Sequence, residues 1–117
     1  MPPAEGEYNF TYPGAGLICD GTEFNTQPED SVGSFEYLDE DGELILASGL
    51  ASESAELTRR APGLYAGTLT LTDAGGTGNY SIFVMTTGET SVKGTVMGTL
   101  TSPDGTCEFW VFYLGEQ

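Results

Sequence analysis

The stretch LYAGTLTLT, residues 64–72, alternates between two kinds of position. From Tyr65 to Leu71 every second residue is apolar or glycine, and the positions after Ala66 that lie between them are all threonine. Because successive side chains of a β-strand point to opposite faces of the sheet, this alternation predicts a strand with one buried and one wetted face. The stretch SVKGTVMGTLT, residues 91–101, repeats the pattern, and the glycines on its buried side indicate a strongly curved sheet.

Strand signals of this kind recur along the chain and are separated by turn sequences such as Asp41-Gly42. The candidate strands are residues 7–12, 16–19, 33–38, 43–47, 64–72, 79–87, 91–101 and 106–114. The one candidate helix, residues 52–60, is short enough to be a strand instead. We therefore predict a single all-β domain over residues 1–117, an antiparallel meander of about eight strands closed into a small β-barrel, with a β-sandwich as the alternative.

Charge is distributed very unevenly along the chain, whose net charge is −15. Residues 1–56 contain thirteen of the eighteen acidic residues and none of the three basic ones. Such a surface repels nucleic acid and attracts basic proteins. No stretch approaches the roughly 20 apolar residues that a membrane-spanning helix needs, so no membrane-spanning segment is expected.

Two cysteines, Cys19 and Cys107, lie near opposite ends of the sequence. Neither belongs to a CxxC motif and the chain has no histidine, which argues against zinc or redox chemistry. A disulfide between them would stabilise a small β-domain and would place the protein in an oxidising compartment, outside the cell or in the cell envelope. The alternative is two separate buried thiols in a cytosolic protein.

Catalysis is the function class that the composition supports least. Without histidine the chain has no conventional Ser-His-Asp or Cys-His arrangement, and neither GxSxG nor SxxK occurs. We therefore predict that the domain is not an enzyme.

The acidic run Asp39-Glu40-Asp41-Gly42-Glu43 has two interpretations. Carboxylates at Asp39, Asp41 and Glu43 alternate as in the first part of a calcium-binding loop. Calcium is the one cofactor that the sequence suggests. The later ligands of such a loop are missing, so a charged hairpin turn is the simpler interpretation.

Two of the candidate strands, residues 79–87 and 106–114, are apolar on both faces. If they pair, the side chains that lie opposite the main buried face form one strip, namely Phe83, Met85, Trp110 and Phe112. This strip is the best candidate for a binding surface, because tryptophan is favoured where proteins contact their partners. The simpler interpretation, which we adopt as the expectation, is that the N-terminal half covers the strip and makes Trp110 part of the core.

The second half of the chain has a recognisable sequence pattern. The run YAGTLTLT, the glycine-rich loop at residues 73–78, the apolar strand and the run TSVKGTVMGTLT are similar to the GxYxGTLxL…G…SVxGTxxG pattern of small meander β-barrel domains of bacterial envelope lipoproteins. The resemblance covers residues 64–114. It implies a barrel and an envelope setting, and it implies no ligand.

These observations together predict a non-catalytic secreted or cell-envelope binding domain with a strongly acidic N-terminal half. Its partner would be a basic protein, a glycan or an apolar small molecule. The alternatives are a small acidic inhibitor of a cationic hydrolase of the lysozyme type, and a structural module of a surface protein.

Overall fold

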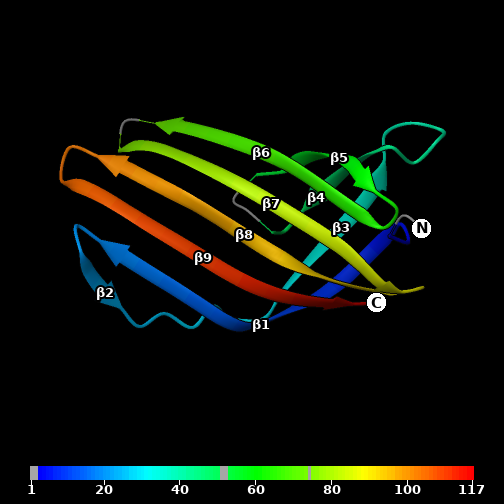
Figure 1. Ribbon diagram of the computed structural model, residues 1–117, viewed down its shortest axis with the longest axis horizontal. Helices are drawn as coiled ribbons and strands as arrows, with labels where there is room; N and C mark the ends of the chain where they lie inside the picture. The colour runs from blue at the N-terminus through cyan, green and yellow to red at the C-terminus, as the bar shows by residue number, and fades with distance from the viewer. Residues whose placement is uncertain (1–2, 51–52, 74) are drawn as a thin grey trace.

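A computed structural model, which describes residues 3–50, 53–73 and 75–117, shows one antiparallel sheet of nine strands that curls into a ring (Figure 1). The strands are β1 (Gly6–Cys19), β2 (Thr22–Phe24), β3 (Ser31–Tyr37), β4 (Leu44–Ser48), β5 (Ala55–Ala61), β6 (Leu64–Asp73), β7 (Gly76–Gly88), β8 (Ser91–Ser102) and β9 (Gly105–Glu116). From β3 to β9 each strand pairs with the next one along the chain. The prediction of an all-β antiparallel meander is confirmed.

Strand β1 closes the ring because it pairs on both of its edges. Its first part, Gly6–Phe10, pairs with β3, and Asn9–Cys19 pairs with β9. Strand β2 lies outside the ring and pairs only with the end of β1. The sequence predicted two strands where β1 is continuous, since Pro13 falls between them. The structure accommodates this proline at a register shift between Thr11 and Gly14, which is where a β-bulge tolerates a residue without an N–H.

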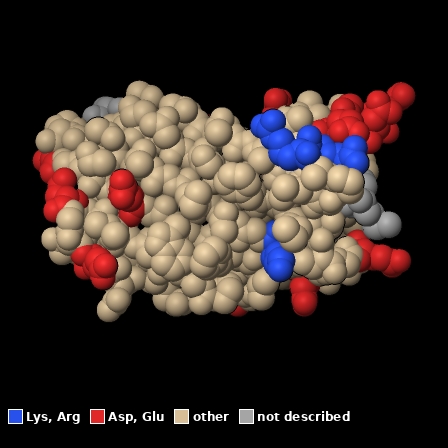
Figure 2. Space-filling view, in the orientation of Figure 1, with Lys and Arg blue, Asp and Glu red and all other residues tan. Residues whose placement is uncertain are grey.

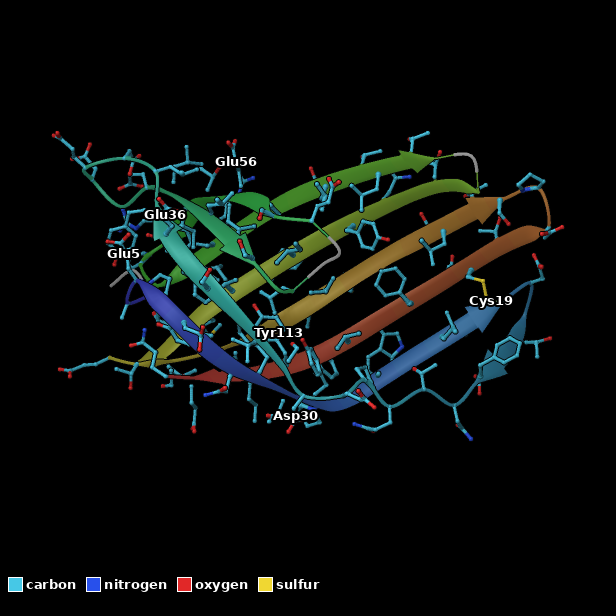
Figure 3. All side chains as sticks on the ribbon, turned by 180° about the vertical axis from the view of Figure 1, so that it is seen from behind. Glu5, Cys19, Asp30, Glu36, Glu56 and Tyr113 are labelled. Atoms are coloured by element: carbon cyan, nitrogen blue, oxygen red, sulfur yellow. A yellow bond between two sulfur atoms is a disulfide. The ribbon has the colours of Figure 1, made fainter. Side chains whose placement is uncertain are left out.

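The two ends of the ring differ because the strands differ in length. Strands β3, β4 and β5 have 7, 5 and 7 residues, whereas β1 and β6–β9 have 10 to 14. The short strands complete the ring at one end, which we call the closed end. The long strands continue past them as a curved open sheet, the open end (Figures 1 and 3). The molecule is therefore not a regular barrel along its length, nor is it the two-layered sandwich considered as the alternative.

Large aromatic side chains fill the closed end. Tyr8, Phe10 and Phe35 come from β1 and β3 and contact one another with ring centroids 5.1–6.2 Å apart. Tyr113 of β9 packs edge-on against Phe10, at 5.6 Å. Burial of such rings supplies most of the hydrophobic stabilisation of a small domain. Among the described residues no buried side-chain oxygen or nitrogen lacks a hydrogen-bond partner.

A side chain approaches the backbone closely at one of the inward-facing glycines, Gly94 of β8. The hydroxyl of Tyr113 crosses β8 at this position and donates a hydrogen bond to the carbonyl of Phe83 on β7. Burial raises the pKa of the Tyr113 hydroxyl, so it remains protonated and able to donate. A β-carbon on Gly94 would collide with both of these oxygens.

Two local predictions need correction. The candidate helix at residues 52–60 is strand β5 from Ala55 onward, because the buried Ala55 and Leu57 alternate with exposed residues as in a strand; Ser52 is outside the described residues. Strand β2 was missed, since its three residues carry no alternation long enough to detect.

Candidate functional site

Six large apolar side chains lie exposed on the outer face of β7, β8 and β9. We call this set the outer strip, and it consists of Phe83, Met85, Met97, Trp110, Phe112 and Leu114. The pairing register brings them together, because Thr95 of β8 lies between Phe83 and Phe112, and Met97 lies beside Trp110. The exposed fraction is 40% for Trp110 and 51% for Phe112.

The expectation that the N-terminal half covers this strip is wrong. Strands β3, β4 and β5 complete the ring on the opposite side of the long strands, as Figure 1 shows behind β7 and β8. They pack on the inward-facing side chains of the sheet, such as Ile82 and Val84, which are almost fully buried. The outward-facing side chains therefore remain uncovered by the rest of the described chain.

Two glycines of β1 determine how the aromatic rings of the strip lie. Gly14 pairs with Phe112 and Gly16 pairs with Trp110. A β-carbon on Gly16 would collide with the indole of Trp110, and one on Gly14 would lie 3.3 Å from the Phe112 ring. Because both glycines lack a side chain, the two rings lean across β1 with their centroids 5.2 Å apart. The arrangement produces a broad and shallow aromatic surface rather than two upright side chains.

A shallow hollow of about 400 Å³ lies within the strip. Phe83 and Met85 line it from β7, and Phe112 and Leu114 line it from β9. Lys93 of β8 lies in register between Met85 and Leu114 and is the basic residue of the hollow. Its methylene chain can extend the apolar wall while its ammonium group stays in water.

The outer face is largely uncharged, although the whole protein is strongly acidic. Figure 2 shows a wide neutral area over the long strands, with acidic groups gathered toward the ends of the molecule. On β9 the exposed Glu108 and Glu116 lie two residues beyond Trp110 and Leu114, at the two ends of the strip. Arg59 of β5 is paired with Glu43 at 2.8 Å.

The inner face of the open end forms a second hollow, of about 590 Å³ (Figure 3). Apolar side chains such as Leu71 and Leu100 contribute to its lining, together with the disulfide between Cys19 and Cys107. This disulfide confirms the prediction, and it joins directly opposed residues of β1 and β9 whose Cα atoms are 4.0 Å apart. Beside it, the carboxylate of Asp20 accepts a hydrogen bond from the Thr106 N–H at 3.1 Å.

The three predicted calcium ligands lie in and beside the turn between β3 and β4. Asp39 accepts a hydrogen bond from the Glu43 N–H at 3.0 Å, and the Glu43 carboxylate pairs with Arg59. Within residues 3–50, 53–73 and 75–117 no group of three or more acidic, histidine or cysteine side chains is arranged to hold a metal ion. In the structure these residues form a charged turn. Calcium binding by Asp39, Asp41 and Glu43 stays an untested prediction.

The predicted binding residues Phe83, Met85, Trp110 and Phe112 share one outward face, but the two strands do not pair with each other as the prediction assumed, because β8 lies between them. Met97 and Leu114 belong to the same surface and were missed. The signal for both was present in the sequence. Met97 shares its face with Lys93, and Leu114 shares its face with Trp110, but only the register shows that these faces are the same.

Comparison with known proteins shows a similar fold. A solved structure described as "Monomer form of M.tuberculosis PknI sensor domain" superposes with a TM-score of 0.64 over 100% of this chain and 88% of that chain. The sequence identity is 13%. No protein-family model matches the sequence, and no curated protein matches it either. In the described part of the chain there is no helix that is long and apolar enough to cross a membrane.

Proposed function

We propose that this domain is a non-catalytic binding domain of a secreted or cell-envelope protein, and that it docks a partner protein through the outer strip. The observation that carries the proposal is the exposure of Phe83, Met85, Trp110 and Phe112 on one neutral face of a chain with net charge −15. Contiguous exposed apolar patches mark interaction sites on soluble proteins, and Trp, Phe and Met are enriched at such sites.

The shape of the strip favours a protein over the other two predicted partner classes. Small-molecule sites enclose most of the ligand surface, whereas this hollow is shallow and lies on the outer face of the sheet. The side chains directly beside the Trp110 ring, Met97 and Phe112, are apolar, which suits a protein surface better than a glycan, although the outward-facing Thr95 and Glu108 lie nearby. The fitting partner surface is an apolar patch with a basic rim, which would meet Glu108 and Glu116 at the ends of the strip.

Three further observations support the proposed setting and class. The Cys19–Cys107 disulfide is typical of oxidising compartments. The structural neighbour is described as a sensor domain, and a sensing role requires binding without chemistry. None of the charged side chains that the structure describes is buried, so the desolvated carboxylate that general acid catalysis usually employs is not among them.

Replacing Trp110 with alanine is expected to weaken partner binding while the fold is retained. Proteins captured from a secreted or envelope fraction by the wild-type domain, and lost with Trp110→Ala, would be purified and their affinity measured. A hot-spot contact of this kind contributes about 2 kcal/mol or more, which is roughly a thirtyfold change in Kd. Because the ring is half exposed, the stability loss in a urea melt should stay well below the 3–5 kcal/mol typical of a buried aromatic residue.

Phe24 provides a matched control, since it is an aromatic residue of β2 that is 50% exposed and lies outside the strip. Phe24→Ala should leave the affinity unchanged. Raising the ionic strength should slow association with a basic partner, because salt screens the long-range attraction. Equal losses in the two variants would contradict docking through the strip. Binding that depends on the acidic half but not on Trp110 would favour the inhibitor alternative.

A further inference from the structure

Strand β6 has a free edge at the open end of the molecule. Strand β5 pairs with β6 only as far as Ala66, and at Gly67 the Glu56 carbonyl lies against the glycine. Beyond this point no described strand pairs with β6 on that side, whereas β7 pairs with it as far as Asp73. In both Figure 1 and Figure 3 the second half of β6 forms the outer border of the sheet.

The ladder with β7 determines which backbone groups face this free edge. The Gly63 carbonyl accepts a hydrogen bond from the Thr86 N–H, and the pairing continues without a shift from Leu64 to Asp73. Hydrogen-bonded pairs alternate along an antiparallel ladder, so the odd-numbered residues of β6 bond to β7. The N–H and C=O groups of Thr70 and Thr72 therefore point away from the sheet.

Up to its last residue, Asp73, this edge carries none of the features that normally prevent strands from pairing edge to edge. Protected edges use charged side chains, proline, bulges or a covering element. Residues 68–72 read TLTLT, with no charge, no proline and no glycine, and their pairing with β7 is regular. The threonines are exposed, and Leu69 and Leu71 are only partly buried on the inner face.

We infer that the free edge of β6 pairs with the same edge of a second copy of this chain. The sequence is self-complementary for such a contact, because TLT at residues 70–72 reads the same in both directions. In an antiparallel pair with Leu71 on the two-fold axis, Thr70 lies opposite Thr72 of the second copy. All the outward backbone groups of both threonines are then satisfied. Leu71 meets its own copy, and the inner faces of the two open ends become continuous.

The neutrality of the edge matters because each copy carries a net charge of −15. Long-range repulsion opposes the approach of two copies, and residues 68–72 add no charge to it; the one charged residue of the contact is Asp73, which lies opposite Leu69 of the second copy. Added salt shortens the Debye length from about 10 Å at 0.1 M to about 3 Å at 1 M. Self-association should therefore strengthen as salt rises, which is the opposite of the dependence expected for a basic partner. The contact is short, so the dimer is weak and depends on concentration.

The test is sedimentation velocity of the purified domain from micromolar to millimolar concentration, at low and high salt, together with amide hydrogen exchange measured by NMR. We expect a monomer–dimer equilibrium that salt favours. The amides of Thr70 and Thr72 should exchange rapidly in the monomer and become protected in the dimer, while Leu69 and Leu71 are protected in both states by β7. A monomer at millimolar concentration in high salt would overturn the inference. So would a dimer in which Thr70 and Thr72 exchange as rapidly as in the monomer.

Thr70→Pro removes a donor from the free edge without removing one from the β6–β7 ladder, and it should weaken the association constant at least about tenfold. Thr70→Val is the matched control, because it keeps the N–H and the branched shape. If Thr70→Pro does not fold, Leu71→Lys places two like charges opposite each other on the axis, and Thr101→Lys adds the same charge elsewhere on the sheet. Loss of the dimer in both lysine variants would contradict the inference. Trp110→Ala should leave self-association unchanged. A failure of the inferred self-association can therefore be distinguished from a failure of partner docking on the outer strip.

Discussion

Replacing both Cys19 and Cys107 with serine is expected to lower the free energy of unfolding by about 2–5 kcal/mol, as loss of a native disulfide does in other small domains. The crosslink joins residues 88 positions apart, so the reduced unfolded chain gains a large amount of conformational freedom. A domain of this size has only about 5–15 kcal/mol of total stability, so the loss would be plain in a urea melt.

Two controls accompany this experiment. Reduction of the wild-type protein should shift the urea midpoint by a similar amount, and thiol titration of the denatured, unreduced protein should find no free thiol. Because the disulfide faces the inner hollow and Trp110 faces outward, the folded variant should keep the fluorescence of the wild type. Two titratable thiols, or a variant as stable as the wild type, would contradict the crosslink.

Gly94→Ala is expected to destabilise the closed end by about 3 kcal/mol or more. Its β-carbon would enter the space occupied by the Phe83 carbonyl and the Tyr113 hydroxyl, and overpacking of this kind typically costs about 1–3 kcal/mol. Displacing Tyr113 also leaves a buried hydroxyl without its acceptor, which costs about another 1–3 kcal/mol.

Thr95→Ala is the neighbouring control, because Thr95 points to the outer face and its truncation should have little effect on stability. Tyr113→Phe removes one of the two colliding oxygens. In that background Gly94→Ala should therefore cost less than in the wild type, a non-additivity that a double-mutant cycle measures. If the costs of Gly94→Ala and Tyr113→Phe simply add, the hydroxyl does not cross β8 at Gly94.

Alternation in the sequence was sufficient to predict the class of the fold and the faces of the long strands. The segments at 64–72 and 91–101 became β6 and β8, and Tyr65, Val92 and Val96 are buried as expected. At the open end the predicted inward side chains Leu69, Leu71 and Leu100 are only partly buried or exposed. Alternation identifies the two faces of a strand but says nothing about which face a distant segment will cover. For that reason the position of the N-terminal half was predicted wrongly.

The sequence indicated short strands before residue 50 and long strands after residue 63, but it could not reveal which side of the long strands the short ones would close. Short β3, β4 and β5 can cover only the inner side of one end, and this leaves both the outer strip and the edge of β6 open. The bulge at Pro13 could not be predicted from the sequence either. It determines that Gly14 and Gly16 face outward beneath Phe112 and Trp110, and a register shift is not visible in a single strand's pattern.

Trp110 is the only tryptophan, so its fluorescence reports directly on whether the outer strip is open in the free domain. The measurement is the emission maximum of the folded protein, together with its quenching by acrylamide and with the urea-unfolded protein as the reference. With 40% of the residue exposed on a neutral face, we expect red-shifted emission and ready quenching. Blue-shifted emission with poor quenching would place Trp110 in the core and would contradict the outer strip as a docking surface.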